Sequence, residues 1–247
     1  MPVFDTHTYL EGYLLPGINQ NITQLHNLLR ARGIERALVM ARRAMQVDPI
    51  AGNRILKAMI DPVPGVYGCL VAHLNRVNAS VQVIRELLSN RKFLGVYLTA
   101  TDPEHPLNPL IADEVLNACR RYQKPIFLRT PNADCVEAGL HLARTYAMHR
   151  FVFLGMGGNE WNAAVRAAHE SVNIYLETSG AMDRMKLTAA IETIGPQRIL
   201  FGSGCPDPDP AAAFGLILDA EISPADQRRI LYDNAMRLFN LEAQEGA

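Results

Sequence analysis

The chain has 247 residues, 49% of them hydrophobic, and its 24 basic and 25 acidic residues give a net charge of −1. This length and apolar content predict a single domain, residues 1–247, with a large core. The charge balance argues against a nucleic-acid or anionic-membrane partner. No apolar run approaches the ~20 residues that span a bilayer, and the N-terminus shows no secretory signal.

The four cysteines, Cys69, Cys119, Cys135 and Cys205, are widely spaced and form no Cys-x-x-Cys pair. This pattern predicts reduced thiols and a cytoplasmic protein. The expected partner is therefore a small molecule rather than nucleic acid or membrane, and a homo-oligomer is compatible with the sequence.

Eight short apolar runs alternate with stretches of helical period along the chain. The runs are predicted strands, in the order 3–9, 36–40, 66–74, 93–98, 124–128, 151–154, 173–177 and 198–201. The helical stretches are 24–32, 48–59, 78–88, 113–122, 133–147, 160–169, 183–194 and a last helix from Ser223-Pro224. The runs are continuously apolar, as in parallel strands buried on both faces. Eight such units predict an α/β fold, a single (β/α)8 TIM-like barrel.

Three polar residues, Asp5, His7 and Tyr9, sit two apart at the end of the first predicted strand. On an extended strand they project from one face. Asp and His are costly to bury without partners, so they are candidates for a site at the barrel mouth, where TIM barrels place their working residues. The alternative is that Asp5 and His7 bond each other and close the first loop.

Six motifs, in order, resemble those of the amidohydrolase superfamily, especially the amidohydrolase-2 family. Asp5-Thr6-His7-Thr8-Tyr9 resembles its opening Asp-x-His-x-His, and the ends of strands five to eight and the last helix continue the likeness. These later motifs are Pro125-Ile126-Phe127-Leu128-Arg129-Thr130, Leu154-Gly155-Met156-Gly157-Gly158, Leu176-Glu177-Thr178-Ser179-Gly180, Arg198-Ile199-Leu200-Phe201-Gly202-Ser203-Gly204-Cys205-Pro206 and Asn234-Ala235-Met236-Arg237-Leu238-Phe239.

The resemblance implies a metal-dependent hydrolase, but of the five positions that hold the metal and activate water only His7 is kept. The other four are Tyr9, Arg129, Gly155 and Gly204. A catalytic zinc takes about three protein ligands, and a permanently charged arginine repels it. Replacement ligands are conceivable at Asp5, Glu177, Cys205 and Asp207. With Arg129 in their midst, we expect no metal or other cofactor.

Two functions remain open. Some metal-free relatives hydrolyse or isomerise lactones, which implies a metal-independent hydrolase or lactonase acting on a small carboxylate-bearing compound, although those enzymes keep the acid replaced by Gly204. Asp5, His7 and Asp207 would then be the acid–base groups. The expected substrate-binding residues are Tyr9, His73, Tyr97, Arg129, Glu177 and Cys205. The alternative is a catalytically inactive barrel that binds a small anion, a carboxylate or phosphate, or serves as a partner subunit.

Overall fold

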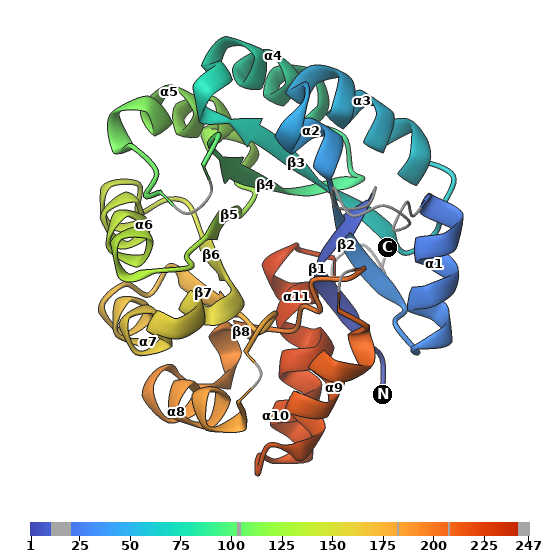
Figure 1. Cartoon of the computed structure of the whole chain (residues 1–247), viewed down its shortest axis with the longest axis vertical. Coiled ribbons are helices and arrows are strands. Elements are labelled where there is room, and N and C mark those ends of the chain that lie inside the picture. Colours follow the sequence, from blue (N-terminus) through green and yellow to red (C-terminus); the bar gives the residue numbers. More distant parts are fainter. Residues whose placement is uncertain (11–20, 103–104, 182, 207, 242–247) are drawn as a thin grey trace.

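Eight parallel strands, each followed by at least one helix, surround the axis along which Figure 1 is viewed. The computed structural model describes residues 1–10, 21–102, 105–181, 183–206 and 208–241. The strands pair in chain order, and they are β1 (Phe4–Leu10), β2 (Arg36–Ala41), β3 (Val66–His73), β4 (Phe93–Thr99), β5 (Ile126–Arg129), β6 (Phe151–Leu154), β7 (Ile174–Glu177) and β8 (Ile199–Leu200). The predicted (β/α)8 barrel is confirmed.

The helices form a ring outside the strands (Figure 1). They are α1 (Ile22–Ala31), α2 (Arg42–Gln46), α3 (Pro49–Ile60), α4 (Val77–Leu87), α5 (Pro109–Cys119), α6 (Ala133–Thr145), α7 (Trp161–Glu170), α8 (Arg184–Ile194), α9 (Pro210–Asp219), α10 (Pro224–Arg228) and α11 (Asn234–Leu238). A π-helical segment, Arg229–Asp233, joins the last two. The predicted start of the last helix at Ser223-Pro224 is confirmed, because Ser223 caps α10 and Pro224 is its first residue.

Helix starts differ from prediction where another side chain caps the backbone. Asn21 and Gln24 form a capping box, so α1 begins before the predicted cap at Thr23. Asn108 accepts the Leu110 N–H, and α5 therefore begins at Pro109, four residues before the predicted start. The predicted Asp48 cap is confirmed, since its carboxylate accepts from two backbone N–H groups of α3.

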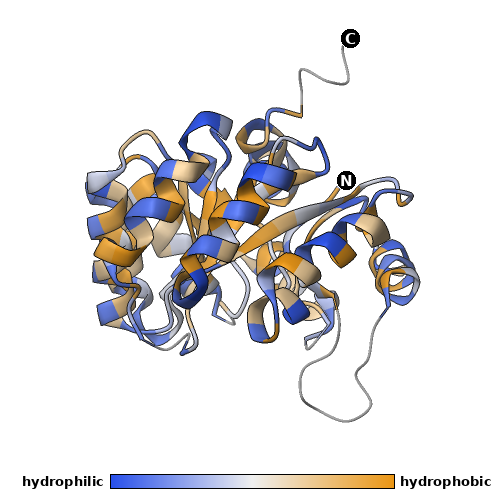
Figure 2. Ribbon diagram, turned by 90° about the horizontal axis from the view of Figure 1, so that it is seen from above, coloured by the Kyte–Doolittle hydropathy of each residue, from blue (hydrophilic) through white to orange (hydrophobic). Residues whose placement is uncertain are grey.

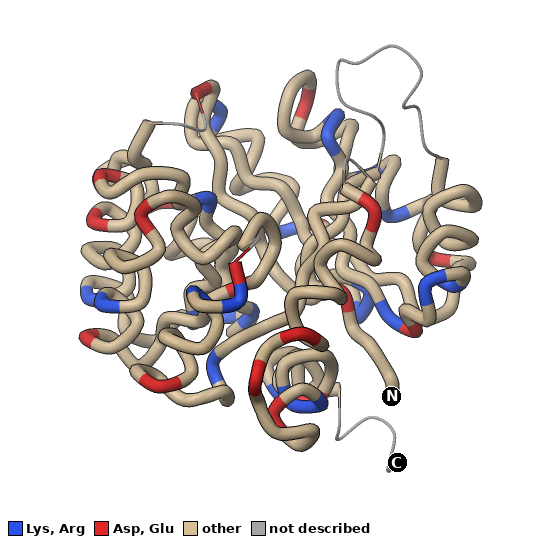
Figure 3. Tube along the Cα trace, turned by 60° about the horizontal axis from the view of Figure 1, so that its bottom comes forward, with Lys and Arg blue, Asp and Glu red and all other residues tan. Residues whose placement is uncertain are grey.

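The core lies inside the barrel and between the strands and helices. In Figure 2 the central strands are mostly hydrophobic, whereas the visible helices carry both hydrophobic and hydrophilic residues. Six phenylalanines fill this space with essentially no exposed surface: Phe4, Phe93, Phe127, Phe151, Phe153 and Phe201. Acidic and basic residues are interspersed over the outer tube in Figure 3. Within the described residues, no helix is long and apolar enough to cross a membrane.

The barrel closes between β1 and the segment that follows the short β8. Thr6 N donates to Phe201 O at 2.9 Å, Gly204 N to His7 O at 2.8 Å and Tyr9 N to Cys205 O at 2.7 Å. These bonds fix the His7–Tyr9 backbone against the β8 loop. The closure therefore positions the part of β1 that carries the candidate site residues.

A buried carboxyl group, Asp5, adds side-chain bonds to this closure. It accepts from Ser203 N at 3.0 Å, from Ser203 Oγ at 2.5 Å and from His7 N at 3.1 Å. Asp5 is fully buried, and burial raises the pKa of its carboxyl group to about 6 despite these bonds.

Gly202, just after β8, lies too close to Glu177 of β7 and to His7 of β1 to carry a side chain. A Cβ atom there would lie 1.9 Å from Glu177 Oε1 and 2.8 Å from His7 Cβ. Glycine at this position lets β7 and the β8 loop come together beneath the barrel mouth.

We expect Gly202→Ala to lower the free energy of unfolding by about 1–3 kcal/mol, because the new methyl group displaces Glu177 or His7. Urea denaturation measures this loss. Gly215→Ala is the matched control: no atom lies within 4 Å of its Cβ position in α9, so it should stabilise the chain by roughly 0.5–1 kcal/mol. Equal midpoints for wild type and Gly202→Ala would contradict the close approach.

Asp5 should make the wild type less stable as pH rises from about 4 to 6. The pKa of Asp5 is raised on folding, so between pH 4 and 6 the folded state binds more protons than the unfolded state. At pH values above this window, ionisation of Asp5 lowers the free energy of unfolding by roughly 3 kcal/mol. Asp5→Asn removes the titration and should flatten this part of the curve. Denaturant midpoints across pH 4–7 test the difference, and parallel curves for the two proteins would refute it.

Candidate functional site

Two cavities share the barrel mouth, where the C-terminal ends of the strands meet. The larger has a volume of about 590 Å³ and lies beside the ends of β2, β3 and β4. The smaller, about 270 Å³, lies beside the ends of β6 and β7 and the β8 loop. Tyr9 at the end of β1 and Arg129 at the end of β5 line both cavities. These two side chains therefore lie where the cavities meet.

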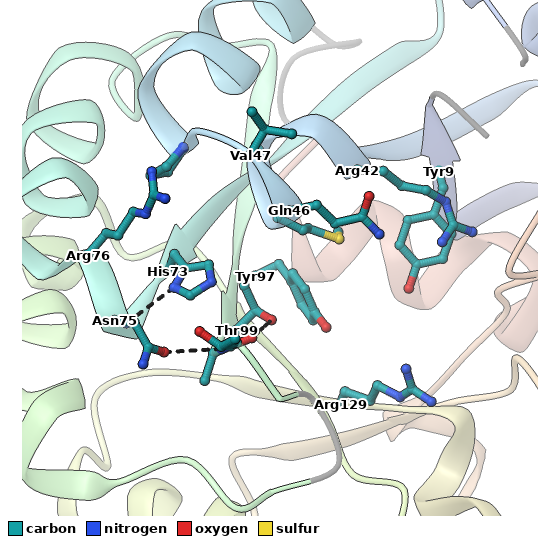
Figure 4. A pocket seen from close by; sticks show the side chains of 15 residues that line it. Tyr9, Arg42, Gln46, Val47, His73, Asn75, Arg76, Tyr97, Thr99 and Arg129 are labelled. Carbon is teal, nitrogen blue, oxygen red and sulfur yellow. Dashed lines mark hydrogen bonds between the residues drawn. The ribbon is translucent and has the colours of Figure 1, made fainter. Parts of the chain in front are cut away.

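Positive charge dominates the larger cavity. Arg42, Arg76 and Arg129 contribute to its wall, and none of the described residues that line it is Asp or Glu. Figure 4 shows these arginines on different sides of the space, with Tyr97 and Thr99 between them. The arrangement favours a ligand with negative charge.

Arg42 supports the tyrosine that separates the two cavities. It begins α2 directly after β2, is 5% exposed, and its Cζ lies 4.1 Å from the centroid of the Tyr9 ring. This is a cation–π contact in a largely desolvated place. It fixes the Tyr9 ring between the cavities.

The predicted residues His73 and Tyr97 also line the larger cavity. His73 ends β3, and its Nδ1 accepts a hydrogen bond from Asn75 N at 3.2 Å. Burial and the nearby positive charge of Arg76 lower the pKa of the His73 imidazole. His73 is thus held as a neutral polar wall residue, and Tyr97 lies near it in Figure 4.

In the smaller cavity, His7 is bonded on both ring nitrogens. Nδ1 lies 3.0 Å from Glu177 Oε2 and 2.7 Å from Ser179 Oγ, while Nε2 lies 2.7 Å from the Tyr9 hydroxyl. His7 and Tyr9 thus contact each other as strand alternation predicts. The alternative hydrogen bond between Asp5 and His7 is also present, from His7 N to the Asp5 carboxylate, but the His7 ring bonds other groups and Asp5 bonds Ser203.

Glu177 lies directly beneath His7 and is fully buried. Its carboxylate accepts from Ser179 N at 2.5 Å, Ser179 Oγ at 2.7 Å and Gly155 N at 3.2 Å, in addition to the contact with His7. The group therefore joins the ends of β1, β6 and β7.

Three of the predicted site residues do not reach the cavities. Asp5, Glu177 and Cys205 have no exposed surface and line neither cavity. The β1–β8 closure and the Glu177 bonds hold Cys205 and Glu177 below the mouth, so their predicted contact with substrate stays a prediction. Asp5 is likewise a buried part of the closure. Asp207 lies outside the described residues.

The described residues of the barrel mouth do not supply the ligands that a catalytic metal ion needs. Both nitrogens of His7 are engaged by protein groups, and the described residues contain no cluster of three or more His, Cys, Asp or Glu that could hold a metal ion. Gly155 and Gly204 adopt φ angles of +71° and +72°, which favour glycine over the side chains that would bind a metal. The donor set that the described residues supply is therefore too small for a catalytic zinc.

Three residues of the site were not predicted from the sequence: Arg42, Arg76 and Ser179. Arg42 comes directly after the C-terminal end of the apolar run of β2. A polar residue at the C-terminal end of a TIM-barrel strand is the signal that could have identified it. Arg76 lies one turn after His73, in the short 3-10 segment Leu74–Arg76 that follows β3. Ser179 lies within the motif Leu176–Gly180, but its contact with His7 depends on the fold, which brings β1 and β7 together.

Comparisons with known proteins identify the family and agree with the barrel fold. A family model described as "Amidohydrolase" matches residues 4–241. Similar solved structures include a 2,6-dihydroxybenzoate decarboxylase from Rhizobium, with 17% identity, 98% of each chain covered and a TM-score of 0.75. A dihydroxybenzoic acid decarboxylase from Polaromonas sp. JS666 with bound manganese has 16% identity, covers 98% of this chain and 97% of its own, and has a TM-score of 0.78.

An amidohydrolase from Burkholderia multivorans with bound HEPES is 14% identical, with 97% of this chain and 99% of that chain covered and a TM-score of 0.76. At these identities the structures establish the fold alone. No curated protein matches the chain. The family model, in contrast, spans nearly the whole chain and includes all eight strands. The chain therefore belongs to the amidohydrolase family.

Proposed function

We propose that the barrel mouth binds a small carboxylate-bearing compound and acts on it as a metal-independent hydrolase or lactonase. The observation that carries this proposal is the charge of the larger cavity, which three arginines line without a carboxylate among its described residues. A volume of about 590 Å³ lies in the range of small-molecule sites, roughly 300–1,000 Å³.

Arg129 is the proposed anchor for the carboxylate. Its side chain is exposed at the end of β5 and lines both cavities, so a ligand in either one can reach the guanidinium. A guanidinium binds a carboxylate through two parallel hydrogen bonds. The dihydroxybenzoate decarboxylases of similar fold, whose names specify small aromatic carboxylates, support this ligand class.

Reaction without a metal is supported by the donor set at the mouth. His7 is the one retained ligand position, and its nitrogens bond Glu177, Ser179 and Tyr9. The alternative function, an inactive barrel that binds a small anion, shares the arginine-lined cavity. Turnover separates the two: incubation with aryl esters and lactones that carry a carboxylate should release acid at a rate that Arg129→Met reduces, and the inactive barrel should release none.

Arg129→Met should weaken binding of benzoate by about ten- to a hundredfold, because one charge-assisted pair contributes roughly 1.5–3 kcal/mol. Isothermal titration calorimetry with benzoate and with inorganic phosphate measures the loss. Arg54→Met is the matched control, since Arg54 pairs with Glu86 on the outer helices at 2.6 Å. Unchanged affinity in Arg129→Met would rule out the anchor.

The purified chain should hold well under one equivalent of zinc, iron or manganese after dialysis, because the described mouth residues supply too few ligands. Elemental analysis by mass spectrometry gives the ratio. His7→Asn serves as the comparison. About one metal ion per wild-type chain, lost in His7→Asn, would show that a metal site exists at the mouth.

A further inference from the structure

Glu177, His7 and Tyr9 form a continuous hydrogen-bonded chain from the interior of the barrel to both cavities. Glu177 is fully buried, His7 is 6% exposed, and Tyr9 lines both cavities. We propose that this chain is a proton relay in which the Tyr9 hydroxyl exchanges protons with the attacking water molecule and the ligand. The inference deepens the proposed function and rests on it for the anionic part of the ligand.

The bonding partners of His7 set the direction of the relay. Ser179 Oγ donates to Glu177 Oε2, so both groups facing Nδ1 have oxygen lone pairs to offer it. Nδ1 therefore carries a hydrogen. In the neutral imidazole Nε2 then has the lone pair, and the Tyr9 hydroxyl, 2.7 Å away, donates to it. The order carboxylate–imidazole–hydroxyl is that of an activated nucleophile or base.

The surroundings of Tyr9 suit a group that loses its proton only during reaction. Burial raises the pKa of the Tyr9 phenol, while the positive charges of Arg42 and Arg129 oppose this rise. The phenol thus keeps its proton at rest and continues to donate to His7. When negative charge develops on its oxygen, the Arg42 guanidinium 4.1 Å from the ring centroid stabilises it.

Hydrolysis of a lactone or ester gives a balanced sequence. The oxygen of a water molecule bonds to the acyl carbon, one water proton passes to Tyr9 Oη, and the Tyr9 proton passes to His7 Nε2. Glu177 holds the resulting imidazolium through Nδ1–H. The acyl C–O bond then breaks, and the departing alkoxide recovers a proton from Tyr9 as His7 returns its own. Tyr9 is the catalytic residue in this sequence, and Glu177 is a positioning residue.

A tyrosine-directed electrophile that bears a carboxylate tests the relay in the full chain. With 4-(fluorosulfonyl)benzoate, Tyr9 Oη bonds to sulfur, the S–F bond breaks, fluoride leaves, and the phenol proton passes to His7. Peptide mapping gives the labelling rate of each tyrosine. Tyr122 is the internal control, because Arg121 stacks on its ring at 4.6 Å, and its hydroxyl contacts Arg121 and a backbone carbonyl rather than a histidine.

We expect Tyr9 to react about tenfold or more faster than Tyr122. His7→Asn keeps an N–H that can face Glu177 but lacks the Nε2 acceptor, so Tyr9 labelling should slow by about tenfold while Tyr122 is unaffected. Glu177→Gln should also slow the labelling of Tyr9. The nitrogen-15 chemical shifts of the His7 ring should then show a smaller share of the Nδ1–H tautomer. A purely structural role for Glu177 would not change the tautomer.

Measurements on the wild-type protein test the relay even if a variant does not fold. The proposal is overturned if Tyr9 reacts no faster than Tyr122 or if the wild-type His7 spectrum shows the Nε2–H tautomer. Neutral benzenesulfonyl fluoride separates the relay from the anion site. Fast, His7-dependent labelling of Tyr9 by both probes at equal rates supports the relay and contradicts the carboxylate anchor, whereas a faster rate for the carboxylate probe supports both.

Discussion

The Glu177 carboxylate is the acceptor on which the geometry of the barrel mouth depends. It receives hydrogen bonds from Gly155 after β6, from Ser179 after β7 and from His7 on β1. A buried carboxylate is costly without such partners, so the three strand ends and the charge stabilise one another. Gly202 makes this possible, because any side chain at that position would occupy the space of the carboxylate.

The fold could be predicted because its signals are local and repeated. Continuous apolar runs mark buried parallel strands, and eight of them leave few topologies other than a closed barrel. The boundaries were less predictable, because several candidate caps stood near each helix start. Asn21 rather than Thr23 caps α1. The short helix α2 has no side-chain cap from which its start could be predicted. The strand β8 is only Ile199–Leu200, and Phe201 O directly after it accepts a hydrogen bond from Thr6 N across the closure.

The candidate site could be predicted only where one strand carries it. The alternation of β1 brought His7 and Tyr9 together as expected, but the β1–β2 register shifts between Asp5 and Thr8, and Asp5 bonds Ser203 below the mouth. The contact between Glu177 and His7 joins residues 170 positions apart. Likewise, no sequence rule places Arg42 on the ring of Tyr9. Contacts of this kind follow from the closed barrel rather than from any segment.

The resemblance to the family motif assigns Arg129 to a metal-binding position, which has a chemical consequence for the proposed function. A guanidinium supplies positive charge and binds carboxylates, but it has no lone-pair-accepting orbital with which to acidify a water molecule as a metal ion does. A hydrolase built on this mouth therefore needs a proton acceptor of its own. By its resemblance to the family motif, Tyr9 stands at the position of the second histidine, and its hydroxyl bonds His7. In the proposed site the substitutions at 9 and 129 are therefore complementary, because one takes over the charge of the metal and the other its handling of protons.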